Sequence, residues 1–131
     1  MLRTVGLIML MGPLGACLNS ENEPTENLPE AYAYISFAAE TATRRERARC
    51  EAAGGEVRRD GMAGWEQCIQ TPPDAGLSCS DSSECADRCM VVGEFSEFGM
   101  PTTGQCSSSD SPFGCYQTVE GGVAEPAICV D

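Results

Sequence analysis

CSDSSECADRC, residues 79 to 89, holds three cysteines. Five more lie before and after this stretch, between residues 50 and 129. The chain has 131 residues and nine cysteines. Setting aside Cys17, which stands alone near the N-terminus, leaves an even set of eight. They are Cys50, Cys68, Cys79, Cys85, Cys89, Cys106, Cys115 and Cys129. The sequence therefore predicts a small disulfide-rich α+β fold stapled by about four disulfides.

Two other uses of these cysteines fit the sequence poorly. Structural zinc sites favour pairs of cysteines two residues apart or histidines, but the chain has no histidine and its tightest spacing is Cys85 to Cys89. A catalytic thiol needs a nearby base or cation, and lysine is absent as well. We therefore predict no metal site, no cofactor and no catalytic residue.

Residues 30 to 53 are expected to form the one N-terminal helix. Pro29 and Glu30 suit a helix start, small apolar residues recur at helical spacing, and Gly54-Gly55 suits its end. Four arginines, at 44, 45, 47 and 49, gather near the end of this segment. Because glutamates are interleaved with them, we expect a solvated, salt-bridged face rather than a lipid or polymer site.

Short strands and turns are expected after the helix. Residues 56 to 59 and 65 to 69 predict a β-hairpin with Asp60-Gly61 at its turn, and Trp65 is expected in its core against the helix. A second hairpin is expected from Cys115 to Val130, turning at Gly121-Gly122.

These elements favour particular disulfides. We expect Cys50–Cys68 to join the helix to the first hairpin, and Cys115–Cys129 to cross the last one. Cys79, Cys85, Cys89 and Cys106 are expected to form an interlocked pair of bonds. Asp81, Glu84 and Asp87, in the same region, lack the spacing of a calcium loop, so we expect them to cap turns and meet solvent.

The N-terminus carries a motif of its own. Arg3 is followed by a mostly apolar run from Val5 to Leu14, then by Gly15, Ala16 and Cys17. This motif resembles the lipobox of bacterial lipoproteins, whose cysteine thiol receives a diacylglycerol and becomes the acylated N-terminus after cleavage. The run is too short, and too interrupted by Gly12-Pro13, for a membrane-spanning helix of about 20 residues. The resemblance implies lipidation at Cys17.

Three segments follow from this assignment. Residues 1 to 16 are the expected lipoprotein signal peptide, 17 to 29 a lipidated N-terminus and flexible tether, and 30 to 131 the helix plus cysteine-rich domain. The run LNSENEPTENLP, residues 18 to 29, is too polar to fold alone. Leu18 after the lipidated cysteine, rather than an aspartate, implies by the same resemblance the outer membrane of a Gram-negative bacterium.

The cysteine-rich part is similar to small exported bacterial cysteine-rich domains of unknown role. The segments that carry the likeness are CEAAGG, WEQC, DAGLSC, CADRC, GQC, FGC and the final ICVD. No activity comes with this resemblance. The spacing of the cysteines at 79, 85 and 89 is also similar to knottin-like inhibitor modules.

Charge and exposed aromatics bear on partners. The net charge is −12, which opposes binding to nucleic acid and suits cationic partners. Phe95 and Phe98, set among Glu94 and Glu97, are the best candidates for a surface that meets another protein. The sequence thus favours a non-enzymatic envelope lipoprotein that binds or scaffolds an envelope protein. Alternatives are an inhibitor-like module, a small enzyme or redox protein, and a structural spacer.

Overall fold

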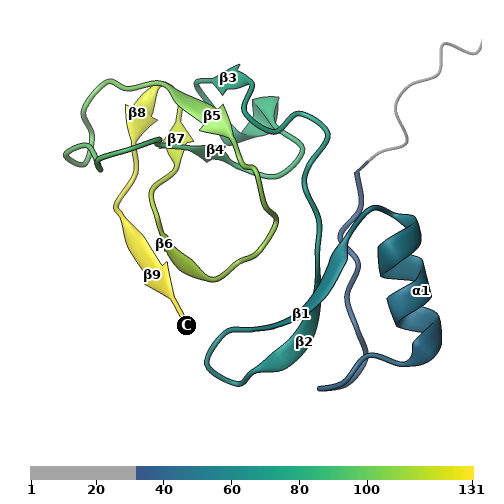
Figure 1. Cartoon of the computed structure of the whole chain (residues 1–131). Coiled ribbons are helices and arrows are strands. Elements are labelled where there is room, and N and C mark those ends of the chain that lie inside the picture. Colours follow the sequence, from purple (N-terminus) through teal and green to yellow (C-terminus); the bar gives the residue numbers. More distant parts are fainter. Residues whose placement is uncertain (1–31) are drawn as a thin grey trace, which may run out of the picture.

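The computed structural model describes residues 32 to 131, which form one short helix and nine short strands. Figure 1 shows α1 beside the β1–β2 hairpin in one part of the molecule and the strands from β3 onward in the other. The elements are α1 (Arg44–Ala52), β1 (Glu56–Asp60), β2 (Trp65–Ile69), β3 (Ser78–Cys79), the 3₁₀ turn η1 (Ser82–Glu84), β4 (Cys89–Met90), β5 (Gly104–Cys106), β6 (Gly114–Tyr116), β7 (Val119–Glu120), β8 (Val123–Ala124) and β9 (Ile128–Val130). A disulfide-rich α+β fold is confirmed. No helix in the described range is long and apolar enough to cross a bilayer.

The predicted helix over residues 30 to 53 is wrong in its N-terminal half. Helix α1 begins only at Arg44, and residues 32 to 43 are extended or bent. Thr43 starts the helix with a capping box: its hydroxyl accepts from the Glu46 amide, and the Glu46 carboxylate accepts from the Thr43 amide at 2.8 Å. Hydrogen bonds from Thr43 and from the Ala38 amide lower the pKa of Glu46 to about 2. Glu30 and Ala31 lie outside the described residues.

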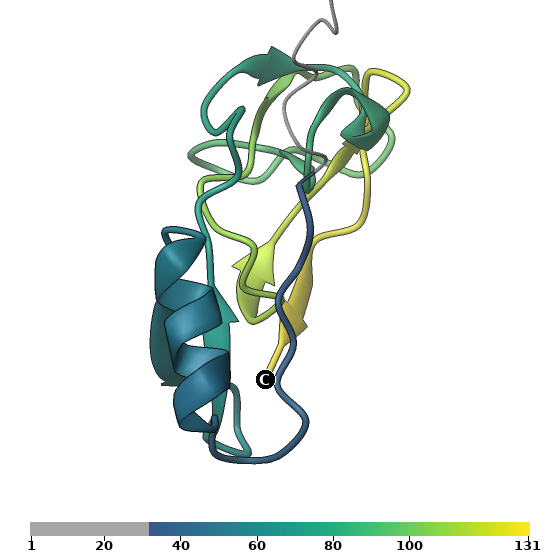
Figure 2. The ribbon, with the colours of Figure 1, turned by 90° about the vertical axis from the view of Figure 1, so that its right-hand side faces the viewer.

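Tertiary contacts hold the segment before α1 in its extended form. Tyr32 donates to Asp110 at 2.6 Å, Tyr34 donates to Asp87, and the Ala42 amide donates to Glu66 at 2.8 Å. Burial and the bond to Asp87 raise the pKa of Tyr34 to about 12. In Figure 2 the segment runs from the middle of the molecule to its lower end before it turns into α1. These long-range bonds outweigh the helix propensity of its alanines, which is the highest of any residue type.

The first hairpin is confirmed, with a longer turn than expected. Strands β1 and β2 pair antiparallel, with Glu56 opposite Ile69 and Asp60 opposite Trp65. The turn takes four residues, 61 to 64, rather than the Asp60-Gly61 pair alone. Gly61 has a positive φ of 69°, and a Cβ there would come within 2.6 Å of the Phe113 ring. Phe113 therefore packs directly on the turn.

Trp65 is not in the core: 47% of its surface is exposed. Successive side chains of a strand point to opposite faces. Glu66 and Cys68 face the helix, where they bond to Arg47 and Cys50. Trp65 consequently lies on the face of β2 that points away from α1, and the expected packing against the helix is wrong.

The four disulfides are Cys50–Cys68, Cys79–Cys89, Cys85–Cys106 and Cys115–Cys129. The first and last are the two bonds expected from the helix and hairpins. The middle two alternate along the chain, which makes them the expected interlocked pair. Cys79–Cys89 joins the outer strands of a three-stranded sheet in the order β3-β5-β4, and Cys85–Cys106 joins the end of η1 to its central strand. Cys79, Cys89, Cys106 and Val119 form the buried core there.

The last hairpin also matches the expectation. Gly121 and Gly122 both have positive φ, at 55° and 78°, as a tight two-residue turn between β7 and β8 requires. Beyond it, β6 pairs with β9, with Cys115 opposite Cys129. Pro126 lies between β8 and β9, where the ladder is interrupted.

Candidate functional site: an exposed phenylalanine loop

Residues 91 to 100, here called the Phe loop, connect the end of β4 to the segment that enters β5. The loop projects from the disulfide-rich part on the side away from α1 (Figure 1). Its first residue is held by a bond from the Val91 amide to the Gln117 carbonyl at 2.8 Å. Its last is held by a bond from the Ala124 amide to the Met100 carbonyl at 2.9 Å. Both ends of the loop are therefore fixed to the strands around the core.

A buried glutamine fixes the middle of the loop. Gln117 is 1% exposed, and its side chain binds both backbone groups of Ser96. Its Oε1 accepts from the Ser96 amide at 2.8 Å, and its Nε2 donates to the Ser96 carbonyl at 2.9 Å. Nε2 also donates to the Glu125 carbonyl at 2.7 Å. A loop held in this way keeps one backbone shape without depending on its own side chains.

The side chains on either side of Ser96 point to solvent. Phe95 is 49% exposed and Phe98 is 70% exposed. Glu94 and Glu97 are exposed as well. Burial of exposed aromatic rings against a partner is favourable, and a preorganised backbone loses little conformational entropy on binding. This loop therefore has the chemistry of a protein contact.

The other acidic residues considered as ligands serve the fold. Asp81 caps η1 through the Ser83 amide at 2.9 Å and also accepts from the Gly121 amide at 2.8 Å. Glu84 accepts from the Ser80 hydroxyl at 2.8 Å. Asp87 accepts from Tyr34 and from Arg88. The expectation that these carboxylates cap turns is confirmed for Asp81, and all three have protein partners.

The arginines of α1 bond mainly outside the helix. Arg47 pairs with Glu66 of β2, and Arg49 donates to the Ser36 carbonyl at 3.0 Å. The Arg47 hydrogen bond holds the pKa of Glu66 below its usual range. In the described part of the chain, then, two of the four arginines tie α1 to its neighbours, in place of the ion pairs expected along the helix itself.

The eight cysteines from Cys50 to Cys129 are committed to disulfides. The sulfurs of Cys79, Cys85 and Cys89 lie within 4.8 Å of one another, and the Asp74 carboxylate lies equally close to those of Cys85 and Cys106. Metal binding by cysteine requires thiolates, which these bonded sulfurs do not supply. Cys17, the expected lipidation site, lies outside the described residues.

Sequence reasoning found the phenylalanines but missed Gln117. Its partners Ser96 and Glu125 lie 21 and 8 residues away, so no local pattern marks it. A glutamine inside a predicted hairpin gives no signal that it will be buried.

Comparison of the chain with protein-family models, with curated proteins and with solved structures returns no match.

Proposed function

We propose that the protein is an exported, lipid-anchored binding module that docks the Phe loop onto another protein of the cell envelope. The single observation that carries the docking is the pair of exposed phenylalanines on a loop fixed by the buried Gln117. Four disulfides indicate an oxidising compartment outside the cytoplasm. The lipobox-like run that ends at Cys17 supports a lipid anchor, and Leu18 after it supports the outer membrane of a Gram-negative bacterium.

The loop defines the chemistry of its partner. Two aromatic rings require an apolar pocket or groove, where a buried phenylalanine contributes about 2 kcal/mol or more. Glu94 and Glu97 beside them require basic or neutral groups at the rim of that pocket. The net charge of −12 acts in the same direction and speeds association with a cationic surface.

A protease inhibitor is the second candidate. Both backbone groups of Ser96 are bound by one buried side chain, so a protease that engages this loop meets a backbone that resists distortion. An inhibitor of this kind presents an aromatic residue to an apolar specificity pocket, and Phe95 precedes Ser96 directly. Both candidates use the same loop, and they differ only in the class of the partner.

Site-specific photo-crosslinking tests the docking surface. We expect a photoreactive amino acid in place of Phe98 to give one discrete protein adduct in cells that produce the full chain. The same group in place of Met62, which is 82% exposed on the first hairpin, is the matched control and is expected to give none. Phe95→Ala should weaken the adduct at position 98 by about 30-fold, the loss of about 2 kcal/mol. Equal adducts at both positions would rule out the loop as the contact, and a protease as the adduct would favour the inhibitor.

Metabolic labelling with a palmitate analogue tests the anchor. We expect Cys17→Ser to abolish labelling completely and to leave the unprocessed precursor, because the thiol is the atom that the lipid modifies. The matched control is Cys115→Ser with Cys129→Ser, which removes two cysteines from the mature domain and should leave the label intact. Label that persists in the Cys17 variant contradicts the lipid anchor, whatever the crosslinking shows.

A further inference from the structure

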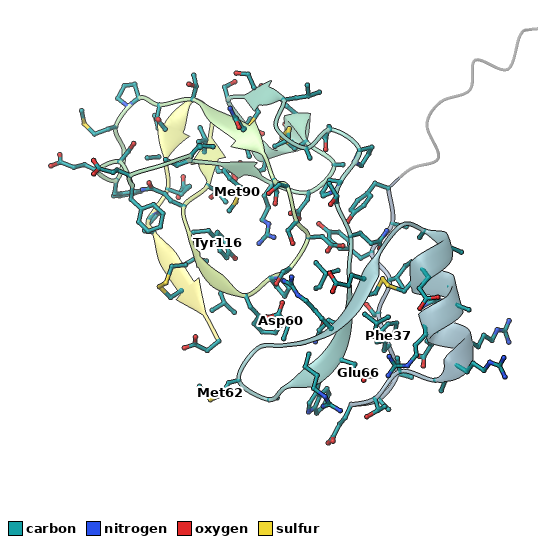
Figure 3. The ribbon with its side chains drawn as sticks, in the orientation of Figure 1. Phe37, Asp60, Met62, Glu66, Met90 and Tyr116 are labelled. Carbon is teal, nitrogen blue, oxygen red and sulfur yellow. A yellow bond between two sulfur atoms is a disulfide. The ribbon has the colours of Figure 1, made fainter. Side chains whose placement is uncertain are left out.

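A cavity of about 570 Å³ lies between the first hairpin and the disulfide-rich part, apart from the exposed rings of the Phe loop. Figure 3 shows Asp60 on the hairpin side of this space, with Met90 and Tyr116 on the other. Its volume is within the range of small-ligand sites, about 300 to 1,000 Å³. We propose that this cavity binds an acidic saccharide, a hydroxyl-rich ring that bears a carboxylate.

The walls of the cavity are fixed before any ligand arrives. Arg88 donates to Asp87 at 2.9 Å and to the Ser111 carbonyl at 2.8 Å, and its guanidinium lies 4.8 Å from the centre of the Tyr116 ring. Ser111 in turn donates to Asp60 at 2.7 Å, which links the hairpin to the loop after β5. A cavity built from this network and two disulfides keeps its shape, so binding costs little reorganisation.

Polar groups with hydrogen-bonding capacity left unused within residues 32 to 131 line this space. Arg58 donates to Asp60 through Nη2 at 3.1 Å, and within residues 32 to 131 its Nε and Nη1 have no acceptor. Over the same range, the side-chain amide of Gln105 and the Ser108 hydroxyl have no hydrogen-bond partner. The Ser109 hydroxyl accepts from the Ser111 amide and has its own proton to donate. These groups offer a cation and several neutral donors and acceptors to one ligand.

The combination selects a class of ligand. The free edge of the Arg58 guanidinium suits a carboxylate, and the hydroxyl and amide groups suit sugar hydroxyls. Phe113 and Tyr116 supply aromatic surface for the apolar face of a sugar ring. A neutral sugar leaves the Nε–Nη1 edge of the Arg58 guanidinium, the edge that Asp60 does not contact, without a charged acceptor. A simple inorganic anion leaves the hydroxyls and rings without a partner.

Calorimetric titration of the full lipidated chain in non-ionic detergent tests this inference. A glucuronate-containing disaccharide is expected to bind, whereas its methyl ester and inorganic sulfate each bind at least 10-fold more weakly. Arg58→Gln should weaken binding of the disaccharide by about 10-fold or more, the loss of a charge-assisted hydrogen bond. Arg59→Gln is the matched control, because it makes the same charge change on the next residue of β1, which points to the opposite face, and it should change the affinity less than 2-fold.

Four results of this titration would overturn or replace the acidic-saccharide site. Equal losses from the two arginine variants would show a general charge effect and overturn the site. Equal binding of sulfate and the disaccharide would reduce it to a simple anion site, and stronger binding of an acidic peptide would replace the saccharide with a peptide. No binding by any probe overturns the inference as well. Phe98→Ala should leave saccharide binding unchanged, so failure here and failure of the docking proposal are distinguishable.

Discussion

Replacing Cys85 and Cys106 together with alanine is expected to lower the free energy of unfolding by about 3 to 5 kcal/mol. The bond closes a loop of sequence separation 21, for which restriction of the unfolded chain alone accounts for about 3 kcal/mol. The remainder comes from the core. Five of the eight buried apolar residues in the described range are disulfide cysteines, and Cys106 is one of them. Because so little else is buried there, the sulfur atoms of this bond also fill space in the core, and their removal leaves a cavity.

Cys115–Cys129 provides the matched control for this experiment. Its sequence separation of 14 gives an entropic contribution almost as large, but both of its cysteines are exposed. Denaturant unfolding of the two double variants, with the other three bonds kept oxidised, therefore separates packing from chain entropy. We expect the Cys85 and Cys106 variant to be less stable than the Cys115 and Cys129 variant by about 1 kcal/mol or more. Equal losses of stability would show that Cys85–Cys106 stabilises the protein only by restricting the unfolded chain.

The cysteine pattern predicted most of this fold because disulfides and tight turns are local constraints. Cys50–Cys68 and Cys115–Cys129 each join elements that are neighbours in sequence, and Gly121-Gly122 has the chemistry that its turn requires. Helix propensity misled over residues 32 to 43. There, Tyr32 and Tyr34 bond to Asp110 and Asp87, which lie 78 and 53 residues away, and nothing in a local window shows those partners.

Of the two candidate sites, local sequence patterns likewise predicted one and missed the other. Phe95 and Phe98 were found because aromatic residues between glutamates mark an exposed segment even without a structure. The sequence did not predict the cavity between the first hairpin and the disulfide-rich part. Arg58 and Ser108 come from segments that only the tertiary fold brings together. Trp65 was misplaced because the face of β2 that meets α1 depends on register, and a shift of one residue reverses the faces.

Gln117→Ala is expected to cost about 2 to 4 kcal/mol, a large loss for a polar substitution. The variant removes three hydrogen bonds and leaves the Ser96 amide and carbonyl and the Glu125 carbonyl without their partner. It also empties the space of a side chain that is 1% exposed. Gln105→Ala is the matched control, because the Gln105 side chain is exposed and has no hydrogen-bond partner within residues 32 to 131, and it should change stability by less than about 0.5 kcal/mol.

The same variant tells whether Gln117 serves the loop or only the core. Amide hydrogen exchange reports on Ser96 directly, since Gln117 accepts the bond from this amide. If the side chain preorganises the Phe loop, exchange at Ser96 should rise under native conditions by more than at Val119, the buried core residue two positions along the chain. The photo-crosslink at position 98 should weaken in parallel, because a mobile loop has to be ordered again on binding. An equal rise at Ser96 and Val119 would mean that the substitution loosens the whole domain, and the loop would then owe its shape to its anchored ends rather than to Gln117.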